Sequence, residues 1–266
     1  PHSYGRPILG WENSLREMNP GGMRSYHHRR YQGANCCLSV AGALEEGLIS
    51  HVLSSPLAAL DTLMDSDQNT RTQSSLSFHS GRQCRTFPRL EAARLMMVWP
   101  VASADDQLAI AGADLATTIL AEGRRSRLVQ KLREELQIVE SIDMDVTTLE
   151  QGSLVMLEAC CPAEQIERVE MEIHQQLNSS LTTAITDEEF HRALQLVGNG
   201  HRFSLEAPGA VAASAGSQTL WGRHRDLLAP LQDLMHWNAS TLRERVMPLL
   251  QPQHSFTLIA RSEDNA

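Results

Sequence analysis

A long polar stretch, MDSDQNTRTQSSLSFHSGRQCR, interrupts the chain at residues 64–85. It has few apolar side chains and no helical or strand period, so it can contribute little to a hydrophobic core. A chain of 266 residues is long enough for one or two domains. We therefore predict a first domain at 1–63, a linker at 64–88 with at most one short strand, and a second domain at 89–266.

The part before the linker predicts two short helices, a strand and a further helix. Leu15, Met18, Met23 and Tyr26 recur at helical spacing on either side of a Pro-Gly-Gly turn at 20–22. The apolar run CLSVAGAL then predicts a buried strand, and EEGLISHVLSSPLAAL predicts a helix.

The part after the linker mixes strands and helices from its first residues. The continuous apolar run EAARLMMVWPVA predicts a strand, and a helix follows that Asp105 and Asp106 cap and Gly123 ends. SRLVQKLREEL predicts another helix. IVESIDMDVTTLEQGSLVMLEACC alternates as two strands that meet at 150–152.

The last third of the chain is mainly helical and ends in a strand. A long helix after Pro162 has a core stripe of Ile166, Val169, Ile173, Leu177 and Leu181. Thr186 and Glu189 form a capping box for the next helix. Helices follow in LLAPLQDLMHW and STLRERVMPLL, and HSFTLIARSE closes as a strand. The fold class is therefore α+β, with helices packed on one mainly antiparallel sheet.

Composition excludes several classes of partner. With 23 basic and 32 acidic residues the chain carries a net charge of −9, which argues against nucleic acid. No apolar run approaches the roughly 20 residues that a membrane span requires. Five cysteines cannot all pair within one chain, so we expect a reducing, cytoplasmic location. The first residue, Pro1, suggests a processed chain or a fragment.

The common catalytic motifs are missing from the sequence. There is no phosphate-binding glycine loop, no serine elbow and no zinc motif of the type His-Glu-x-x-His or its inverse. The nearest approach, Glu170 with His174, is interpreted as an ion pair on one helix face. Taken alone, these residues predict an acidic two-part α+β protein and leave its function open.

A resemblance takes the interpretation further. HSYGRPILG, SLREM and RRYQGANCCLSVAGAL, followed by EGRRSRLVQKLREELQIVESI and TDEEFHRALQLV, stand in an order that resembles the pitrilysin/insulinase-type zinc metallopeptidases. These inverzincins include mitochondrial processing peptidase. Ser126-Arg127-Leu128 and Leu132-Arg133-Glu134-Glu135 match the commonest pattern of the family's second domain. The resemblance implies two similar domains, the first incomplete here, each with helices on a mainly antiparallel sheet.

The family implies hydrolysis of peptides or unfolded polypeptides by a zinc-bound water inside a closed chamber. Its zinc motif would lie upstream of Pro1, so we assign no metal ligand in this segment and expect the segment alone to be inactive. The resemblance also implies a dimer with the same or a related subunit. A catalytically inactive partner or scaffold subunit of the family, and an unrelated binding module, remain alternatives.

The second domain of such enzymes contributes an arginine and, seven positions later, a tyrosine that reach the substrate. Arg133 matches the arginine, but Glu140 stands where tyrosine is expected. An ionised carboxylate cannot donate a hydrogen bond to an oxyanion. Some members of the family are heterodimers in which one subunit carries the zinc motif and the other the arginine-tyrosine pair, so a chain without the tyrosine resembles the zinc-bearing subunit. The resemblance places Ser126 and Arg127 beside the substrate chamber. Without it, Arg133 is a solvated helix charge, and Ser126 and Arg127 mark a helix break with a basic tip.

Overall fold

The computed structural model describes residues 2–60 and 76–263. Contacts divide the chain into two compact units, which we describe separately. Unit 1 comprises residues 1–76 and 203–227, and unit 2 comprises residues 77–202 and 228–266. The boundaries at 63 and 88 remain predictions, and residues 64–75 of the predicted linker lie outside the described residues.

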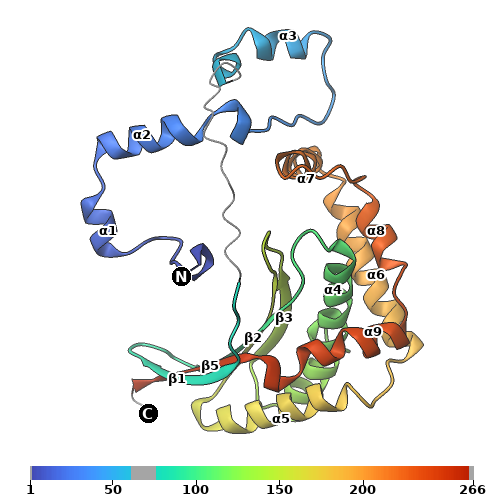
Figure 1. Ribbon diagram of the computed structural model, residues 1–266. Coiled ribbons are helices and arrows are strands. Elements are labelled where there is room, and N and C mark those ends of the chain that lie inside the picture. Colours follow the sequence, from blue (N-terminus) through green and yellow to red (C-terminus); the bar gives the residue numbers. More distant parts are fainter. Residues whose placement is uncertain (1, 61–75, 264–266) are drawn as a thin grey trace. The chain divides into compact units, whose positions relative to one another are not determined.

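Unit 2 is built on a five-stranded sheet with the order β1-β5-β2-β4-β3 (Figure 1). The strands are β1 (Gly81–Phe87), β2 (Ala93–Pro100), β3 (Ser141–Thr147), β4 (Leu154–Cys161) and β5 (Phe256–Ser262). Only the β1–β5 pair is parallel among the strand pairs of these residues; the other three pairs are antiparallel. The predicted α+β class with a mainly antiparallel sheet is therefore confirmed, and β1 is a short strand within the predicted linker.

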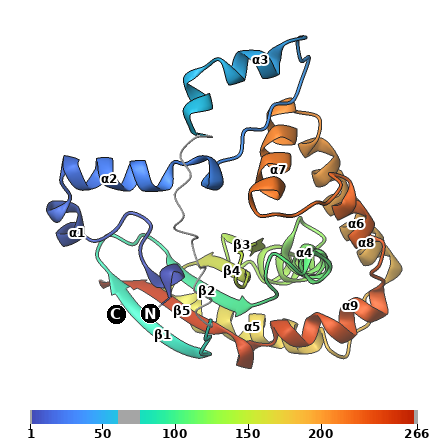
Figure 2. The same cartoon turned by 45° about the horizontal axis from the view of Figure 1, so that its top comes forward.

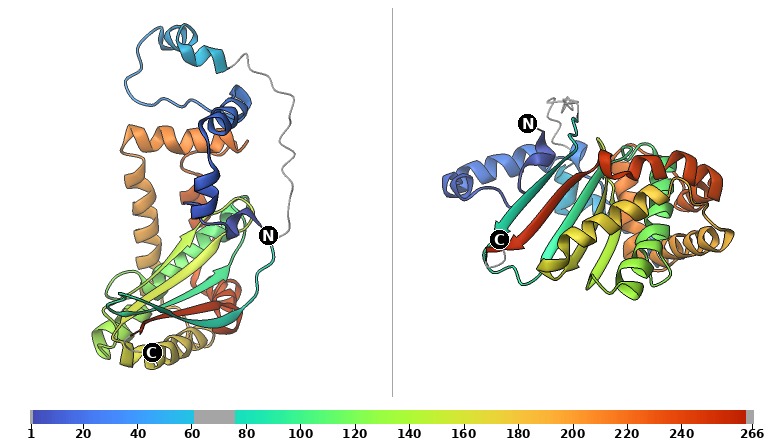
Figure 3. Two further views of the ribbon diagram at one scale, coloured as in Figure 1. Left: turned by 90° about the vertical axis from the view of Figure 1, so that its left-hand side faces the viewer. Right: turned by 90° about the horizontal axis from the view of Figure 1, so that it is seen from below.

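Helices cover one face of this sheet. Contacts with its strands come from α4 (Gln107–Ala121), α5 (Ile166–Ser179) and a π-helix, η4 (Val129–Glu135). Outside these lie α6 (Asp187–Ser204), α8 (Ala229–Leu234) and α9 (Ala239–Arg245), of which α8 and α9 contact α4. Three short 3-10 helices complete the set: η5 (Ala163–Gln165), η6 (Met247–Leu250) and η7 (Pro252–His254). The helix α5 lies across the strands (Figure 3, right), and α4 contacts both β3 and α8 (Figure 2).

Strand alternation places the core on the helical face. In β2, Leu95, Met97 and Trp99 are fully buried, whereas Arg94, which precedes Leu95, is exposed on the opposite face. The indole Nε1 of Trp99 donates a hydrogen bond to the carbonyl oxygen of Gln251 at 2.9 Å, which satisfies its one polar atom. The core is thus continuous from the sheet to the segment before β5.

The predicted helix stripe on α5 is largely correct. Ile166, Val169, Ile173 and Leu177 are fully buried against the sheet. Leu181 is 40% exposed, because α5 ends at Ser179 and the chain turns away before position 181. The prediction was wrong only for that last position.

A tight contact fixes α4 against the segment that precedes α9. A Cβ atom placed on Gly112 would lie 2.4 Å from Cζ2 of Trp237, so only glycine fits there. The indole Nε1 of Trp237 donates to the carbonyl oxygen of Leu108 at 3.0 Å. The absent side chain at Gly112 therefore lets a buried tryptophan lie directly on a helix backbone.

Unit 1 is helical where it is described. It contains α1 (Glu12–Glu17), α2 (Pro20–Arg30), α3 (Leu48–Leu53) and α7 (Pro208–Leu220), with the 3-10 helices η1 (Ser3–Gly5), η2 (Gly33–Asn35) and η3 (Pro56–Leu60). Pro20 opens α2 behind an Asn19 cap, so Pro-Gly-Gly begins a helix and is not the predicted turn. The predicted helix over 45–60 forms only as α3 and η3.

The strand predicted in CLSVAGAL, residues 37–44, is absent. The described part of unit 1 contains no strand with which this run could pair, and Leu38 is 59% exposed. A lone strand leaves its backbone hydrogen bonds unmade, so an apolar run without a partner does not form one. No apolar side chain in the described part of unit 1 is buried.

Candidate functional site

The candidate site begins where α4 ends. Gly123 adopts a left-handed φ of +77°, which a helix end of this kind favours. Ser126 is fully buried, and its Oγ donates to the carbonyl oxygen of Gly123 at 2.7 Å. The hydroxyl of Ser126 therefore closes the turn between α4 and the π-helix.

Arg127 connects this turn to the start of α6. Its Nε and Nη2 donate to the two carboxylate oxygens of Glu189 at 2.6 and 2.9 Å, and Nη2 also donates to the carbonyl oxygen of Ala184 at 3.0 Å. Only 13% of the Arg127 side chain is exposed. The guanidinium is thus occupied by partners within unit 2.

Glu189 also completes the predicted capping box. The backbone N–H of Thr186 donates to Glu189 Oε2 at 2.9 Å, and the Glu189 N–H donates to Thr186 Oγ1 at 3.2 Å, which confirms that prediction. Burial works to raise the pKa of Glu189, but hydrogen bonds from Arg127 and Thr186 outweigh it and hold the pKa below its usual value.

Arg133 lies on the π-helix η4, where the predicted helix SRLVQKLREEL takes the wider coil. Its side chain is 39% exposed, and Nε and Nη2 donate to Oε1 of the neighbouring Glu134 at 3.0 and 2.9 Å. Glu134 also accepts from Arg124 at 2.6 Å, and hydrogen bonds from Arg124 and Arg133 lower its pKa. Arg133 is therefore held in place by one carboxylate while part of its guanidinium remains accessible.

A strained residue follows this π-helix. Gln137 has a φ of +53°, a left-handed conformation that is costly for a residue with a side chain. The wide coil is closed by hydrogen bonds from Leu136 N to the carbonyl oxygen of Lys131 and from Ile138 N to that of Leu132, both at 3.0 Å. Sequence reasoning missed this feature because no glycine or asparagine marks the position. Unusual helices and strained residues are often found at functional sites.

Glu140 lies at the entry to β3. Its N–H donates to the carbonyl oxygen of Cys160 at 2.8 Å, and its side chain is exposed. The Cys160 thiol lies 3.6 Å from Glu140 Oε2 and donates to it. Burial, followed by the charge of Glu140, raises the pKa of Cys160, so the thiol stays protonated. Glu140 therefore offers an acceptor where the family pattern has a phenol donor.

Charged side chains occupy the face of the sheet that the helices leave uncovered. The register places Asp143 opposite Glu158, and Arg94 forms an ion pair with Glu158. Burial, and then the charges of Glu158 and Asp145, raise the pKa of Asp143. The alternation in SIDMDVT could have predicted this acidic row, which the sequence analysis did not single out.

No set of ligands for zinc is visible in the described residues. No group of three His, Cys, Asp or Glu side chains there could hold a metal ion. Glu170 binds Arg82 of β1 through two hydrogen bonds at 2.8 and 2.9 Å, so the predicted pair with His174 was wrong. Nε2 of His174 is buried without a hydrogen-bond partner, and burial lowers the pKa of this imidazole. These residues do not fit a metal site.

Within the described ranges, no helix is both long enough and apolar enough to cross a membrane. Two tryptophans lie in the core: Trp99 is fully buried and Trp237 is 8% exposed.

Comparisons with known proteins agree with this architecture. A protein of Bacillus subtilis described as the uncharacterized zinc protease YmxG is 22% identical over 265 residues, which cover 98% of this chain and 62% of that protein. A solved protease from Helicobacter pylori matches with a TM-score of 0.76 at 14% identity, over 95% of this chain and 62% of that one. The chain thus spans about three fifths of the length of these relatives.

A second solved structure gives the same fold. The peptidase M16 inactive domain from Pseudomonas fluorescens has a TM-score of 0.76 at 13% identity, over 97% of this chain and 61% of that one. The family model described as the peptidase M16 inactive domain matches residues 18–197, which is more than half of the chain. The resemblance to zinc metallopeptidases is therefore confirmed at the level of the family, and the chain belongs to the peptidase M16 family through its inactive-domain region.

Proposed function

We propose that this chain is the part of a zinc metalloendopeptidase that receives and positions substrate, while the catalytic zinc is held by residues outside the described segment. The family membership, and the description of the Bacillus subtilis relative as a zinc protease, support this proposal. The substrate would be an unfolded polypeptide in a closed chamber, and the compartment would be the cytoplasm. Five cysteines without a disulfide are compatible with that reducing location.

We further propose the domain organisation predicted above, with residues 1–63 as the end of an incomplete first domain. The observation that supports it is the exposure of large apolar side chains in unit 1, for example Ile8, Leu9 and Trp11. Contiguous exposed apolar surface of this kind normally packs against another part of a protein. The remainder of a first domain of the same family would supply that cover.

The single observation that carries a substrate role is the setting of Arg133. The guanidinium is fixed by Glu134 while 39% of the side chain is exposed, on a π-helix that the strained Gln137 follows. A fixed guanidinium can donate to backbone carbonyls of an extended peptide and stabilise negative charge. Ser126 and Arg127 would act differently, as residues that position this π-helix, because their donors already have partners within unit 2.

The test uses the full-length protein and an extended fluorogenic peptide. We expect cleavage that a chelator abolishes and zinc restores, and an Arg133→Ala variant that loses about tenfold or more in kcat/KM, the effect of one charged hydrogen bond. Arg125→Ala is the matched control, since Arg125 lies in the turn before the π-helix and forms an exposed pair with Glu188 of α6. Equal kcat/KM values for the two variants would contradict a role of Arg133 in substrate binding.

A second candidate is an inactive partner or scaffold subunit of the same family, and Glu140 favours it. A carboxylate at this position repels developing negative charge and accepts from Cys160 where a phenol would donate. Under this proposal the full-length chain forms a stable hetero- or homodimer and cleaves nothing alone. Glu140→Tyr should then raise cleavage only when a zinc-bearing partner is present, and activity of the wild-type chain alone would contradict this second proposal.

A further inference from the structure

A cavity of about 240 Å³ opens on the helical side of unit 2, away from Arg133 and Glu140. Its walls come from the segment after β2, the first turns of α4, and the segment from α9 to η6. The lining residues are Val101, Ala102, Asp106, Leu108, Ala109, Ala113, Trp237, Arg245, Val246 and Leu249. All of them belong to unit 2, so the cavity is a property of one folded unit.

The cavity wall is apolar and reaches the surface. Eight of the ten lining residues are apolar, and Leu108 and Leu249 at the opening are 37% and 50% exposed. The volume is smaller than the roughly 300–1,000 Å³ of pockets that hold drug-sized ligands. One leucine- or phenylalanine-sized side chain is therefore a suitable occupant.

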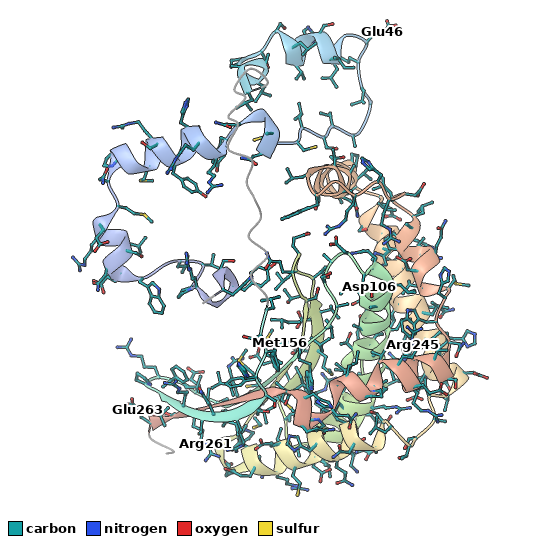
Figure 4. The ribbon with its side chains drawn as sticks, in the orientation of Figure 1. Glu46, Asp106, Met156, Arg245, Arg261 and Glu263 are labelled. Atoms are coloured by element: carbon teal, nitrogen blue, oxygen red, sulfur yellow. The ribbon has the colours of Figure 1, made fainter. Side chains whose placement is uncertain are left out.

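The two polar lining residues are a cation and an anion, labelled in Figure 4 on α9 and at the start of α4. The guanidinium carbon of Arg245 lies 5.5 Å from the ring centroid of Trp237, which restricts its position. Among the described residues no carboxylate pairs with Arg245, whereas Arg243 on the same helix has Glu244 within 4.0 Å. Arg245 therefore has hydrogen-bond donors available at the cavity.

Asp106 complements this cation. Its Oδ1 accepts a hydrogen bond from the N–H of Ala109 at 3.0 Å, as the N-cap of α4, which fixes the position of the carboxylate. The second oxygen of the carboxylate can accept from a ligand N–H. The cavity thus combines an acceptor, a donor and an apolar space.

We propose that this cavity binds an α-amino carboxylate with an apolar side chain. The side chain would fill the apolar space against Trp237, the carboxylate would pair with Arg245, and the α-nitrogen would donate to Asp106. Such a group exists as a free amino acid and as the C-terminal residue of a peptide. The inference does not depend on the proposed peptidase activity, because binding requires neither zinc nor a first domain.

The test is calorimetric titration of the full-length protein with L-leucine, N-acetyl-L-leucine and L-leucinamide. Binding of leucine but not the acetylated form identifies a free amino acid, and binding of N-acetyl-leucine identifies a peptide C-terminus. L-Leucinamide, which lacks the carboxylate, should bind about tenfold more weakly or not at all. No binding of any of them at 10 mM, or equal binding of leucinamide, would overturn the proposal.

Two variants distinguish a loss of ligand binding from a general destabilisation of the fold. Arg245→Gln should weaken carboxylate binding by about tenfold and leave the melting temperature nearly unchanged, because Arg245 is exposed and has no ion pair among the described residues. Arg243→Gln, on the same helix but outside the cavity lining, should bind like the wild type. Equal loss in both variants, or no loss in Arg245→Gln, would contradict the assignment.

Discussion

Arg127 and Glu189, 62 positions apart, meet through two parallel hydrogen bonds of 2.6 and 2.9 Å and tie the turn before the π-helix to the first turn of α6. Both side chains are mostly buried, with 13% and 22% exposed. Removing one partner of such a pair leaves the other charged group largely buried and unpaired, which destabilises the folded chain.

We expect Arg127→Met to lower the free energy of unfolding by roughly 2–3 kcal/mol, somewhat less than for a fully buried pair. Replacing both residues, as Arg127→Met with Glu189→Gln, should recover part of that loss, because no carboxylate is then left unpaired. Urea unfolding at pH 7 measures both variants. A double variant that is less stable than the single one would contradict this account.

The same pair predicts a dependence on pH. The pKa of Glu189 is lower in the folded chain than in the unfolded chain, so the unfolded chain binds more protons and the contribution to stability is lost as the pH falls through the folded-state value. The difference in stability between wild type and Arg127→Met should therefore shrink on acidification below the usual glutamate pKa. A constant difference from pH 7 to pH 3.5 would show that the pair does not act through this charge.

Gly112 provides a test of packing. Alanine favours helices over glycine by about 1 kcal/mol, yet a Cβ at this position meets the buried ring of Trp237 at 2.4 Å. We expect Gly112→Ala to destabilise unit 2 by about 2 kcal/mol, because the overpacking cost exceeds the helix gain. Gly200→Ala, in α6 with no atom within 4 Å of the new Cβ, should instead be stabilising by up to about 1 kcal/mol. Chemical denaturation of the two variants measures the change in the free energy of unfolding. A change of the same sign in both variants would contradict the steric explanation.

The cysteines should separate into two reactivity classes. Cys36, Cys37 and Cys84 are exposed, whereas Cys160 and Cys161 are buried. Burial, and then the neighbouring Cys160, raise the pKa of Cys161 to about 12, so it has almost no thiolate at pH 8. Maleimide labelling with peptide mapping should show that the three exposed cysteines react within minutes. The buried Cys160 and Cys161 should react only in denaturant. Early labelling of Cys161 in native protein would contradict the buried position of β4.

The contact between Arg82 and Glu170 should limit the local opening of β1. All seven residues of this edge strand are exposed, and the two hydrogen bonds to Glu170 connect it to α5. We expect Glu170→Gln to speed hydrogen exchange of β1 amides by about fivefold, a modest effect since half of the Arg82 side chain is exposed. Glu172→Gln on the same helix is the control, and β2 amides should not change. Unchanged exchange in β1 would mean that the backbone pairing with β5 alone holds the strand.

Local signals in the sequence predicted the elements whose stabilising contacts are close in the chain. The capping box at Thr186 and Glu189 and the N-cap at Asp106 need only three or four residues, and both form as expected. The alternation through β3 and β4 likewise fixes which face is buried. These features depend on spacing, which a single sequence contains.

Features that depend on distant partners could not be predicted. The run at 37–44 has the composition of a strand, but pairing requires a second strand that the described part of unit 1 lacks. Glu170 lies 88 positions from Arg82, and no local pattern distinguishes that partner from His174. The family pattern directed attention to Arg127, while only the three-dimensional structure identifies Glu189 as its partner.

The position of β5 in the sheet affects the order of synthesis and folding. β1 and β2 leave the ribosome well before β5, but they do not pair with each other, because β5 lies between them and Gly81 pairs with Phe256. Contacts so far apart in sequence form slowly and late. During translation β1 therefore stays unpaired until β5 has been synthesised, and a ribosome stalled before position 256 would carry an unfinished sheet with an open edge for chaperones to recognise.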